Sequence, residues 1–317
     1  MRQLLNSAAC VDLLNEPIKT ARTDMKSSGR CVLLLAILVC LSVSFNLLPV
    51  VGAIVGGESA ADGEFPHMAA LGRRCTESSA GVGGACDDGT YEWFCGGSLI
   101  ADRFVLTAAH CAHSGMSLPP EVVRIGVRDL RHTVPGQDYG VRTIVQHPNY
   151  GRFLSYNDIA LIELDRPVTR VQPACLWAAE PIPPDMPLIA TGWGKVGHFE
   201  APSTLLQRVQ IPIIPNEKCN QLLYRSRRIR YGVLPSQLCA GDLAGVKDTC
   251  EGDSGGPLQL QPPFQPSSVG LMGRSCRYYV VGITSHGGVC GTVNRPGLYT
   301  RVSYFIDWIR QVLEGAH

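Results

Sequence analysis

The segment DTCEGDSGGPL, residues 248–258, decides most of what this sequence implies about its fold. It contains one serine, Ser254, among three acidic residues and three glycines. Taken alone, a glycine-rich stretch of this kind is typical of an ordinary loop. A serine hydroxyl is too weak a nucleophile to attack an amide unaided, so a catalytic role for Ser254 requires a base from elsewhere in the chain.

Two other stretches supply candidate partners for Ser254. LTAAHCAH contains His110, and YNDIALIEL contains Asp158. A histidine can take and return a proton near neutral pH, and a carboxylate can hold its ring in one tautomer. Each stretch has an ordinary structural explanation when taken separately. The three segments become informative only when they are taken jointly, in the order His, Asp, Ser.

Three further stretches accompany these, namely IVGG at 54–57, CGGSLI at 95–100 and TGWG at 191–194. Together with the His, Asp and Ser segments they resemble the chymotrypsin-like (S1 family) serine peptidases, in the trypsin-like branch. The resemblance covers residues 54–317, which we expect to form one catalytic domain. It implies an all-β fold of two six-stranded antiparallel Greek-key barrels with a C-terminal helix.

Local patterns agree with that fold. Short β-branched runs between Gly, Pro and Asn turns predict strands at 122–127, 143–147, 158–164, 205–214, 278–284 and 297–302. The segment 303–315 places apolar residues at helical spacing, with Ser303 as the expected N-cap. Many short strands and one terminal helix favour a sandwich or barrel over alternating βαβ units.

The resemblance assigns a role to each catalytic candidate. Ser254 is the expected nucleophile, and His110 is the base that takes its proton and returns it to the leaving amine. Asp158 is expected to orient the His110 ring and to stabilise its cation. The backbone N–H groups of Gly252 and Ser254 are the expected oxyanion-hole donors, because glycine leaves the way to them unobstructed.

The same resemblance predicts a substrate pocket formed by Asp248, Ser285, Gly287 and Gly297. Asp248 stands where trypsin-like members place a carboxylate at the floor of the pocket, and the two glycines stand at its walls. A buried carboxylate at the end of an open slot selects Arg or Lys, since an unpaired buried charge is costly. His286 replaces the aromatic residue of most relatives, which leaves preferences further along the substrate open.

The residues around Ile54 predict an activation step. In the family a freed Ile ammonium folds inward and pairs with the carboxylate beside the nucleophile, here Asp253. The residue before Ile54 is Ala53, which a trypsin-like activator would not cut. Residues 1–53 are therefore expected to be a leader that signal peptidase removes after Ala53, or after Ser44 to leave a pro-segment for an elastase-like protease. Missing upstream exons are the third explanation.

The leader contains an uncharged apolar run at 31–45, preceded by Lys26 and Arg30, which is the plan of a secretory signal peptide. The alternative is a membrane anchor, because the apolar stretch extends far enough to span a bilayer. Asn46 and Pro49 interrupt that stretch and favour the signal peptide. We therefore expect a secreted, extracellular protein without stable membrane association.

Thirteen cysteines favour an oxidising compartment. Ten of them follow residue 53, an even number that allows full pairing. The resemblance implies four pairs: Cys95 with Cys111, Cys219 with Cys239, Cys250 with Cys290, and Cys75 with Cys86. In the related enzymes the equivalent of Cys175 tethers this domain to a pro-region. Here Cys175 is expected to pair with Cys276 or to remain free.

Stretches at 63–72, 166–177 and 276–287 look most like the arthropod clip-domain peptidases of the snake type. Those enzymes act in extracellular immune or developmental cascades, so the expected partners are protein substrates, including zymogens, and an inhibitor such as a serpin. The segment before Ile54 is too short and hydrophobic to be a clip domain. The main alternative is a non-catalytic homologue that regulates a cascade, a class that usually lacks the serine.

The formal charge of +1 gives no reason to expect a nucleic acid partner. No stretch has zinc-ligand spacing, and the loop at 126–140 lacks the acidic residues with which some relatives bind calcium, so we predict no metal and no cofactor. One local exception is the arginine-rich stretch RSRRIRYG, residues 225–232. A solvated basic loop is its ordinary explanation, and an exosite for an anionic partner is the other.

Overall fold

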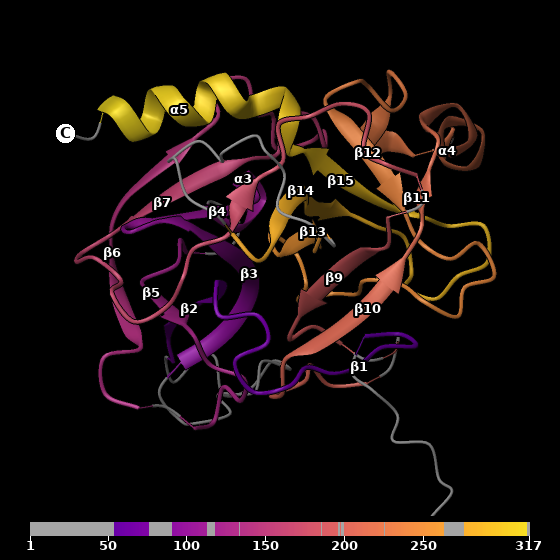
Figure 1. The fold of residues 1–317 in the computed structure, drawn as a ribbon. Coiled ribbons are helices and arrows are strands. Elements are labelled where there is room, and N and C mark those ends of the chain that lie inside the picture. Colours follow the sequence, from indigo (N-terminus) through magenta and orange to yellow (C-terminus); the bar gives the residue numbers. More distant parts are fainter. Residues whose placement is uncertain are drawn as a thin grey trace, which may run out of the picture. The chain divides into compact units, whose positions relative to one another are not determined.

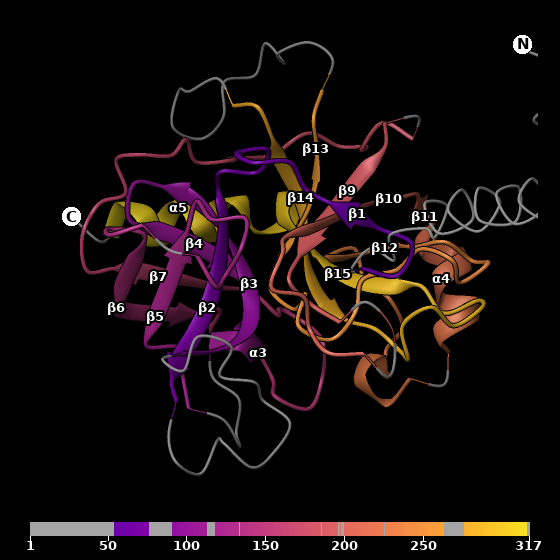
Figure 2. The same ribbon diagram turned by 90° about the horizontal axis from the view of Figure 1, so that it is seen from below.

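The computed structural model describes residues 54–75, 91–112, 118–132, 134–184, 186–195, 197, 200–224, 226–262 and 276–315. Within these residues the regular structure is mostly β-strand, and the longest helix is α5, Ile306–Gly315. Two sheets lie side by side, and both views show α5 beside the first of them (Figures 1 and 2). The predicted all-β class with a C-terminal helix is confirmed. No helix in the described ranges is long and apolar enough to cross a membrane.

The first sheet is a closed six-stranded barrel. Its strands, in hydrogen-bonded order, are β2 (Met68–Arg74), β3 (Tyr91–Ala101), β4 (Phe104–Thr107), β7 (Ala160–Leu164), β6 (Asp138–Gln146) and β5 (Val122–Ile125), which returns to β2. Branched side chains that point inward fill the barrel, including Leu71, Leu99, Val105, Val123 and Leu161, none of them exposed to solvent. A closed barrel has no free edge, so this half needs no partner to complete its ladders.

A buried arginine links two neighbouring strands, β5 and β6, of the first barrel. Arg124 on β5 is only 2% exposed. Its Nε and Nη2 donate to the two carboxylate oxygens of Asp138 on β6, at 2.6 and 2.9 Å. Its third nitrogen, Nη1, donates to the Leu130 carbonyl, and the Trp93 ring lies 4.5 Å from the guanidinium carbon. The buried charge is therefore matched by a carboxylate of the same barrel.

The second sheet is assembled from the rest of the chain. Its strands run in the order β1 (Glu58–Ser59), β10 (Gln207–Ile211), β9 (Leu188–Gly192), β13 (Pro257–Leu260), β14 (Tyr279–His286), β15 (Gly297–Arg301), β12 (Gln237–Ala240) and β11 (Ile213–Ile214). The short strand β8 (Cys175–Leu176) adds to β14 in parallel. The core of this half includes Leu188, Leu238, Leu258 and Tyr299, all fully buried.

Proline explains why the second sheet is not closed by one continuous ladder. β10 and β11 are a single extended segment interrupted at Pro212, which has no N–H to give to a ladder. The segment pairs with β9 before Pro212 and with β12 after it, so the chain itself joins the two ends of the curled sheet. Counted as one strand, β10 and β11 complete the second set of six that the resemblance implies. The predicted strand at 205–214 is thus two strands.

Four helical segments complete the described fold besides α5: α3 (Ala109–Ala112), α4 (Asn216–Leu223), η2 (Arg227–Ile229) and η3 (Val302–Phe305). α5 packs Ile309 and Leu313 against the core of the first barrel. The prediction of Ser303 as N-cap is wrong, because the chain turns first through the 3₁₀ segment η3. There the Ser303 hydroxyl donates to Glu180 at 2.5 Å, and the N-cap position of η3 is Arg301, which makes no side-chain capping hydrogen bond.

The described residues contain four disulfides. Three join the cysteines that the resemblance pairs: Cys95 with Cys111, Cys219 with Cys239, and Cys250 with Cys290. The fourth joins Cys175 to Cys276, where β8 lies beside β14, and so decides between the two alternatives left open for Cys175. The expected pair of Cys75 with Cys86 includes a residue outside the described ranges, as does the whole leader 1–53.

Candidate active site

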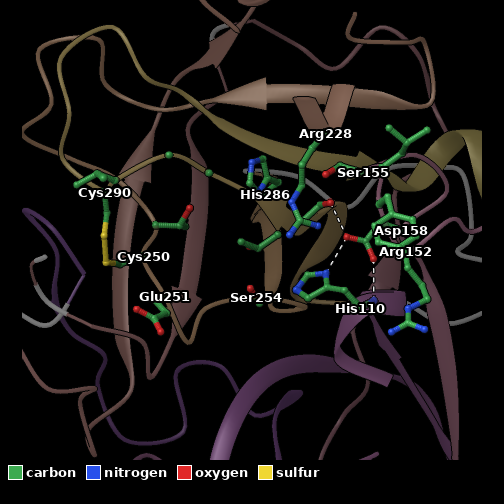
Figure 3. A pocket seen from close by; sticks show the side chains of 18 of the residues that line it. His110, Arg152, Ser155, Asp158, Arg228, Cys250, Glu251, Ser254, His286 and Cys290 are labelled. Atoms are coloured by element: carbon green, nitrogen blue, oxygen red, sulfur yellow. Dashed lines mark hydrogen bonds and ion pairs between the residues drawn. A yellow bond between two sulfur atoms is a disulfide. The ribbon is translucent and has the colours of Figure 1, made fainter. Parts of the chain in front are cut away.

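A cavity of about 750 Å³ lies where residues of the two sheets face each other. His110 and Asp158 reach it from the first barrel, and Ser254 reaches it from the second half (Figure 3). Ser285 and Gly287, also from the second half, line the same cavity. The His, Asp and Ser segments, which are far apart in the sequence, therefore meet in one place. The structure places all three catalytic candidates on the wall of this single cavity.

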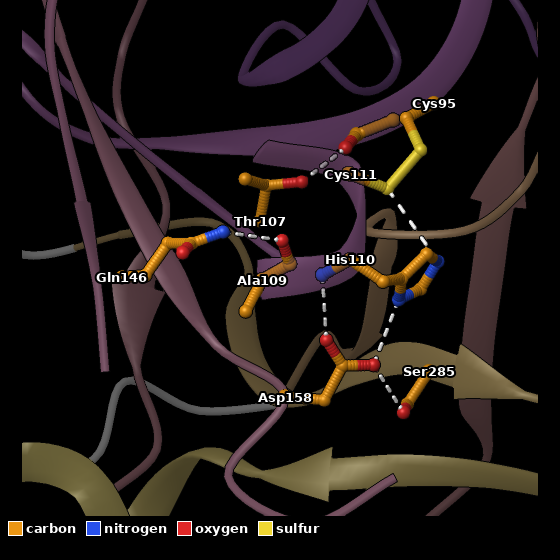
Figure 4. Close-up of a disulfide and its surroundings, with 9 residues drawn as sticks. Cys95, Thr107, Ala109, His110, Cys111, Gln146, Asp158 and Ser285 are labelled. Carbon is orange, nitrogen blue, oxygen red and sulfur yellow. Dashed lines mark hydrogen bonds and ion pairs between the residues drawn. A yellow bond between two sulfur atoms is a disulfide. The ribbon is translucent and has the colours of Figure 1, made fainter. Parts of the chain in front are cut away.

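Asp158 holds His110 at two points. The His110 Nδ1 atom lies 2.7 Å from Asp158 Oδ2, and the His110 backbone N–H donates to Asp158 Oδ1 at 2.9 Å (Figure 4). Burial opposes ionisation of the imidazole, yet the charge and hydrogen bond of Asp158 outweigh it and raise the pKa of His110 above its ordinary value. The pKa of Asp158 is lowered by the same pairing, although its burial works in the opposite direction.

Two contacts from the second half support the Asp158 carboxylate and its backbone. Ser285 Oγ donates to Asp158 Oδ2 at 2.5 Å, and Thr300 Oγ1 donates to the Asp158 carbonyl oxygen at 2.8 Å. Asn157, just before Asp158, has a φ of 52°, a left-handed conformation that asparagine tolerates well. Ser285 was predicted at the substrate pocket and lines the cavity, but no feature of the sequence indicated its bond to Asp158. Thr300 had no signal in the sequence.

The loop that carries Ser254 is shaped by glycine. Gly255 has a φ of 77°, and a Cβ there would lie 2.5 Å from the Gly96 carbonyl oxygen. The Gly96 N–H in turn donates to the Ser254 carbonyl at 2.7 Å, which ties β3 of the first barrel to this loop. Only glycine fits so close an approach, which explains the GDSGG pattern physically.

The side chains of Ser254 and His110 are not hydrogen-bonded to each other. No hydrogen bond connects them in the part of the chain that the structure describes, and His110 Nε2 instead lies 3.7 Å from Cys111 Sγ (Figure 4). Catalytic hydrogen bonds are often long before a substrate binds. Within the described ranges no group accepts a hydrogen bond from the backbone N–H of Gly252 or Ser254. Ser254 lines the cavity, whereas Gly252 lines a separate hollow beside Trp193 and Lys195, so the oxyanion hole formed by these two N–H groups stays a prediction.

Asp253, the predicted activation residue, is completely buried. Its Oδ1 accepts from the Gly194 N–H at 2.9 Å and its Oδ2 from the Cys250 N–H at 2.8 Å. Burial raises the pKa of Asp253 to about 7. Among the described residues it forms no ion pair. Ile54 is also fully buried, but its nitrogen is a peptide nitrogen bonded to Ala53 and carries no charge.

Asp248 is a second buried carboxylate, 7% exposed, at the start of the same loop. Its Oδ2 accepts from the Gly291 N–H at 3.1 Å, while its Oδ1 is buried without a hydrogen-bond partner. Burial raises the pKa of Asp248 to about 6. The neighbouring residue Thr249 lines the cavity, whereas Asp248 itself lies behind the lining. No cationic side chain of the described residues forms a salt bridge with it.

The two predicted wall glycines differ in their surroundings. A Cβ added to Gly287 would meet nothing within 4 Å, so this residue borders open space. A Cβ at Gly297 would lie 3.0 Å from the hydroxyl oxygen of Tyr299, so a larger residue there would displace that ring. Gly287 lines the cavity together with His286, and Gly297 lies deeper, at the start of β15.

One group of potential metal ligands occurs in the described part of the chain, namely Cys95, His110 and Cys111. The two cysteines are joined in a disulfide, so they have no thiolate to offer a metal ion. The group therefore does not fit a metal site, and the His110 ring is already bonded to Asp158. The arrangement instead suits proton transfer next to a serine hydroxyl.

A closed barrel and a curled sheet that face each other across an Asp–His pair and a serine on a glycine loop are consistent with the two-barrel architecture of chymotrypsin-like serine hydrolases. The family model Trypsin matches residues 54–309. The chain belongs to the trypsin family of serine-type endopeptidases.

Sequence similarity to individual proteases shows which members of the trypsin family this chain resembles. Serine protease snk of Drosophila melanogaster is 41% identical over 276 residues, covering 85% of this chain and 59% of that protein. Phenoloxidase-activating factor 3 of Holotrichia diomphalia is 39% identical, covering 81% and 72%. Serine protease Hayan of Drosophila melanogaster is 36% identical, covering 88% and 42%. The chain is thus a trypsin-like homologue of arthropod serine proteases, and it spans less than two thirds of the two Drosophila relatives.

Proposed function

We propose that this protein is a secreted endopeptidase that cleaves protein substrates after Arg or Lys. The observation that supports this specificity is the buried carboxylate of Asp248, which has one oxygen without a hydrogen-bond partner and forms no salt bridge with any of the described residues. Burying an ionised carboxylate without a counter-charge is costly. A guanidinium or ammonium group of the substrate, entering past Gly287, supplies that charge.

The chemistry follows from the residues around Ser254. His110 takes the proton of the Ser254 hydroxyl as the oxygen attacks the substrate carbonyl, and returns it to the leaving amine. Asp158 stabilises the imidazolium that forms between these steps. The backbone N–H groups of Gly252 and Ser254 donate to the oxyanion, and losing one such donor costs about 10² to 10³ in rate. Water then attacks the acyl group on Ser254 while His110 takes a proton from that water, and His110 returns the proton to the Ser254 oxygen as the acid product leaves.

Activation is proposed to require cleavage between Ala53 and Ile54. The new ammonium of Ile54 would pair with Asp253, whose carboxyl otherwise prefers to keep its proton because it is buried. Ionised Asp253 would then fix the loop that carries Ser254. Val55 already forms a β-bridge with Asp248, so the new chain end is tethered near the pocket it is expected to complete.

The biological setting is inferred from the relatives and the leader. Residues 1–53 are proposed to be a cleaved leader and 54–317 the catalytic domain. One relative is named as an activator of phenoloxidase, which supports a role in an extracellular proteolytic cascade, immune or developmental. The expected partners are another zymogen as substrate and a serpin-type inhibitor.

One experiment tests the enzyme and its specificity. The chain is expressed for secretion, the N-terminus of the product is sequenced, and hydrolysis of arginyl, lysyl and phenylalanyl amides is compared, with Ser254→Ala as the matched control. We expect Ile54 as first residue, hydrolysis of the arginyl and lysyl amides alone, and no activity in the control. A folded product that begins at Ile54, hydrolyses nothing and ignores a fluorophosphonate probe would instead identify a non-catalytic regulator.

A further inference from the structure

We propose that Arg228 forms a subsite for an acidic side chain of the substrate, two to four residues ahead of the bond that is cut. The inference rests on the proposed peptidase function and narrows its substrate class. A preferred substrate would carry Arg or Lys at the cleaved position and Asp or Glu shortly before it. Arg228 of the arginine-rich stretch then belongs to the active site.

The segment that carries Arg228 is fastened to the rim of the cavity. Arg228 belongs to the 3₁₀ turn η2, whose buried residue Ile229 anchors it. The Arg228 carbonyl accepts from the Ser155 N–H at 2.9 Å, three residues before Asp158. Tyr156 reinforces the junction, because its hydroxyl donates to the Gly232 carbonyl. A side chain on this turn therefore has a defined place beside the catalytic candidates.

The Arg228 side chain reaches into the cavity, toward His286 and His110 (Figure 3). Its positive charge lowers the pKa of His286 in addition to the larger effect of burial, and it opposes the effect of Asp158 on His110. Among the described residues no carboxylate forms a salt bridge with Arg228. Of the groups in the described part of the chain, Asp158, Arg228 and His286 interact electrostatically with His110, and Tyr150 and Arg152 line the same cavity.

The remaining charges of the cavity wall do not neutralise Arg228. Asp158 is engaged by His110, and Glu251 lies 2.6 Å from the ammonium of Lys195. Arg152 adds a second cation to the lining. The wall on this side therefore carries positive charge next to the very histidine that must become cationic during catalysis.

An extended substrate would bring an acidic residue to this place. With its Arg or Lys directed toward Asp248 and its scissile carbonyl at Ser254, the preceding residues pass along His286 at the end of β14 and Gly287. These residues would approach Arg228. A planar guanidinium binds a carboxylate through two parallel hydrogen bonds, which makes it selective for Asp and Glu over their amides. Such a carboxylate would also offset the repulsion between Arg228 and protonated His110.

The test uses the secreted form that begins at Ile54 and a set of arginyl peptide amides. Asp, Glu, Asn and Gln are placed in turn at each of the three positions before the arginine. We expect kcat/KM to be about 10-fold higher with an acid than with its amide at one position, an effect that weakens at high salt. Arg228→Gln should remove the preference, and Arg228→Lys should retain part of it.

Arg227→Gln is the matched control, because Arg227 lies on the same turn, is exposed and does not line the cavity. It should keep the preference. A second readout is the dependence of kcat/KM on pH, measured on the acid side for a peptide without acidic residues. Removing a nearby positive charge raises the pKa of His110, so this dependence should move to higher pH in Arg228→Gln and stay unchanged in Arg227→Gln.

The outcomes separate the two proposals. An enzyme that cuts arginyl peptides but treats each acid and its amide alike overturns the subsite and leaves the peptidase assignment intact. Equal loss of the preference in Arg227→Gln and Arg228→Gln would also overturn the subsite, because it would point to general surface charge. A protein that cuts no arginyl peptide overturns both proposals.

Discussion

The two halves of the molecule treat buried charge differently. In the first barrel, Arg124 is matched by Asp138 across neighbouring strands, and Asp158 is matched by His110. In the second half, Asp248 and Asp253 are buried at either end of one short loop, and within the described ranges neither is paired with a cation. Burial raises the pKa of both carboxyl groups, to about 6 and about 7.

The difference in how the two halves pair their buried charges indicates which residues govern activation and substrate choice. The first barrel is complete in itself, because its ladders close and its own residues match its charges. In the second half, two buried acidic positions have no cationic partner within the described ranges. We expect the ammonium of Ile54 to form an ion pair with Asp253, and the Arg or Lys side chain of the substrate to form one with Asp248. Changes at the His110–Asp158 pair should therefore affect the chemical step, and changes at Asp253 and Asp248 should affect activation and substrate choice.

The largest expected effect concerns the charge pair of the first barrel. Asp158→Asn should lower kcat on an arginyl amide by about 10⁴-fold, the magnitude that the same exchange has in this family's template enzyme. The reason is that an amide holds His110 in the wrong tautomer and cannot stabilise its cation. A cooperative unfolding transition like that of the unaltered enzyme would confirm that the variant is folded. A variant with kcat within 10-fold of the original would break the assignment of this pair.

The next largest effect concerns substrate choice in the second half. Asp248→Ser should lower kcat/KM on arginyl amides by about 10³-fold, since the substrate cation would be left buried without a partner. Labelling of Ser254 by a small fluorophosphonate should persist, because the chemical machinery is untouched. For the unaltered enzyme, KM on these substrates should rise as the pH falls through about 6, where Asp248 gains its proton. Retained arginyl cleavage would refute the pocket assignment.

The third prediction concerns the stability of the second half before and after cleavage at Ile54. In the uncut chain the folded protein holds the Asp253 proton up to about pH 7, whereas the unfolded chain releases it near pH 4. The uncut form should thus lose roughly 3 to 4 kcal/mol of unfolding free energy between pH 4 and pH 7.

The cut form provides the comparison for that measurement. Its Ile54 ammonium should depress the pKa of Asp253, so its stability should not fall over the same range. Asp248 is present in both forms, and the difference between two urea-denaturation series therefore isolates Asp253. Parallel pH profiles would show that the two groups do not pair.

The smallest expected effect lies at the contact between the halves. Ser285→Ala removes one charge-assisted hydrogen bond to Asp158 and should lower kcat about 10-fold with little change in KM. Thr300→Val is the matched control, because Thr300 donates only to the backbone oxygen of Asp158. It should have the weaker effect on kcat. A larger loss in Thr300→Val would mean that backbone placement outweighs the bond to the carboxylate.

Much of the fold was predictable from short stretches of sequence, but their junctions were not. The run at 205–214 has the composition of one strand, and only pairing with two different neighbours divides it at Pro212. Ser303 precedes an amphipathic run and has the expected type for a cap, yet Glu180, 123 residues away, takes its hydroxyl. Local sequence propensity gives no information about partners that are distant in the sequence and compete for the same groups.

The sequence by itself determined the family, the all-β class and the residue types that chemistry of this kind requires, because those depend on local pattern and on motif order. Tertiary structure alone decided that Cys175 bonds Cys276, 101 residues away, that Ser285 bonds Asp158, 127 residues away, and that Arg228 enters the cavity. Such contacts depend on how two curled sheets meet. That geometry is set by the packing of the whole core and by no single segment.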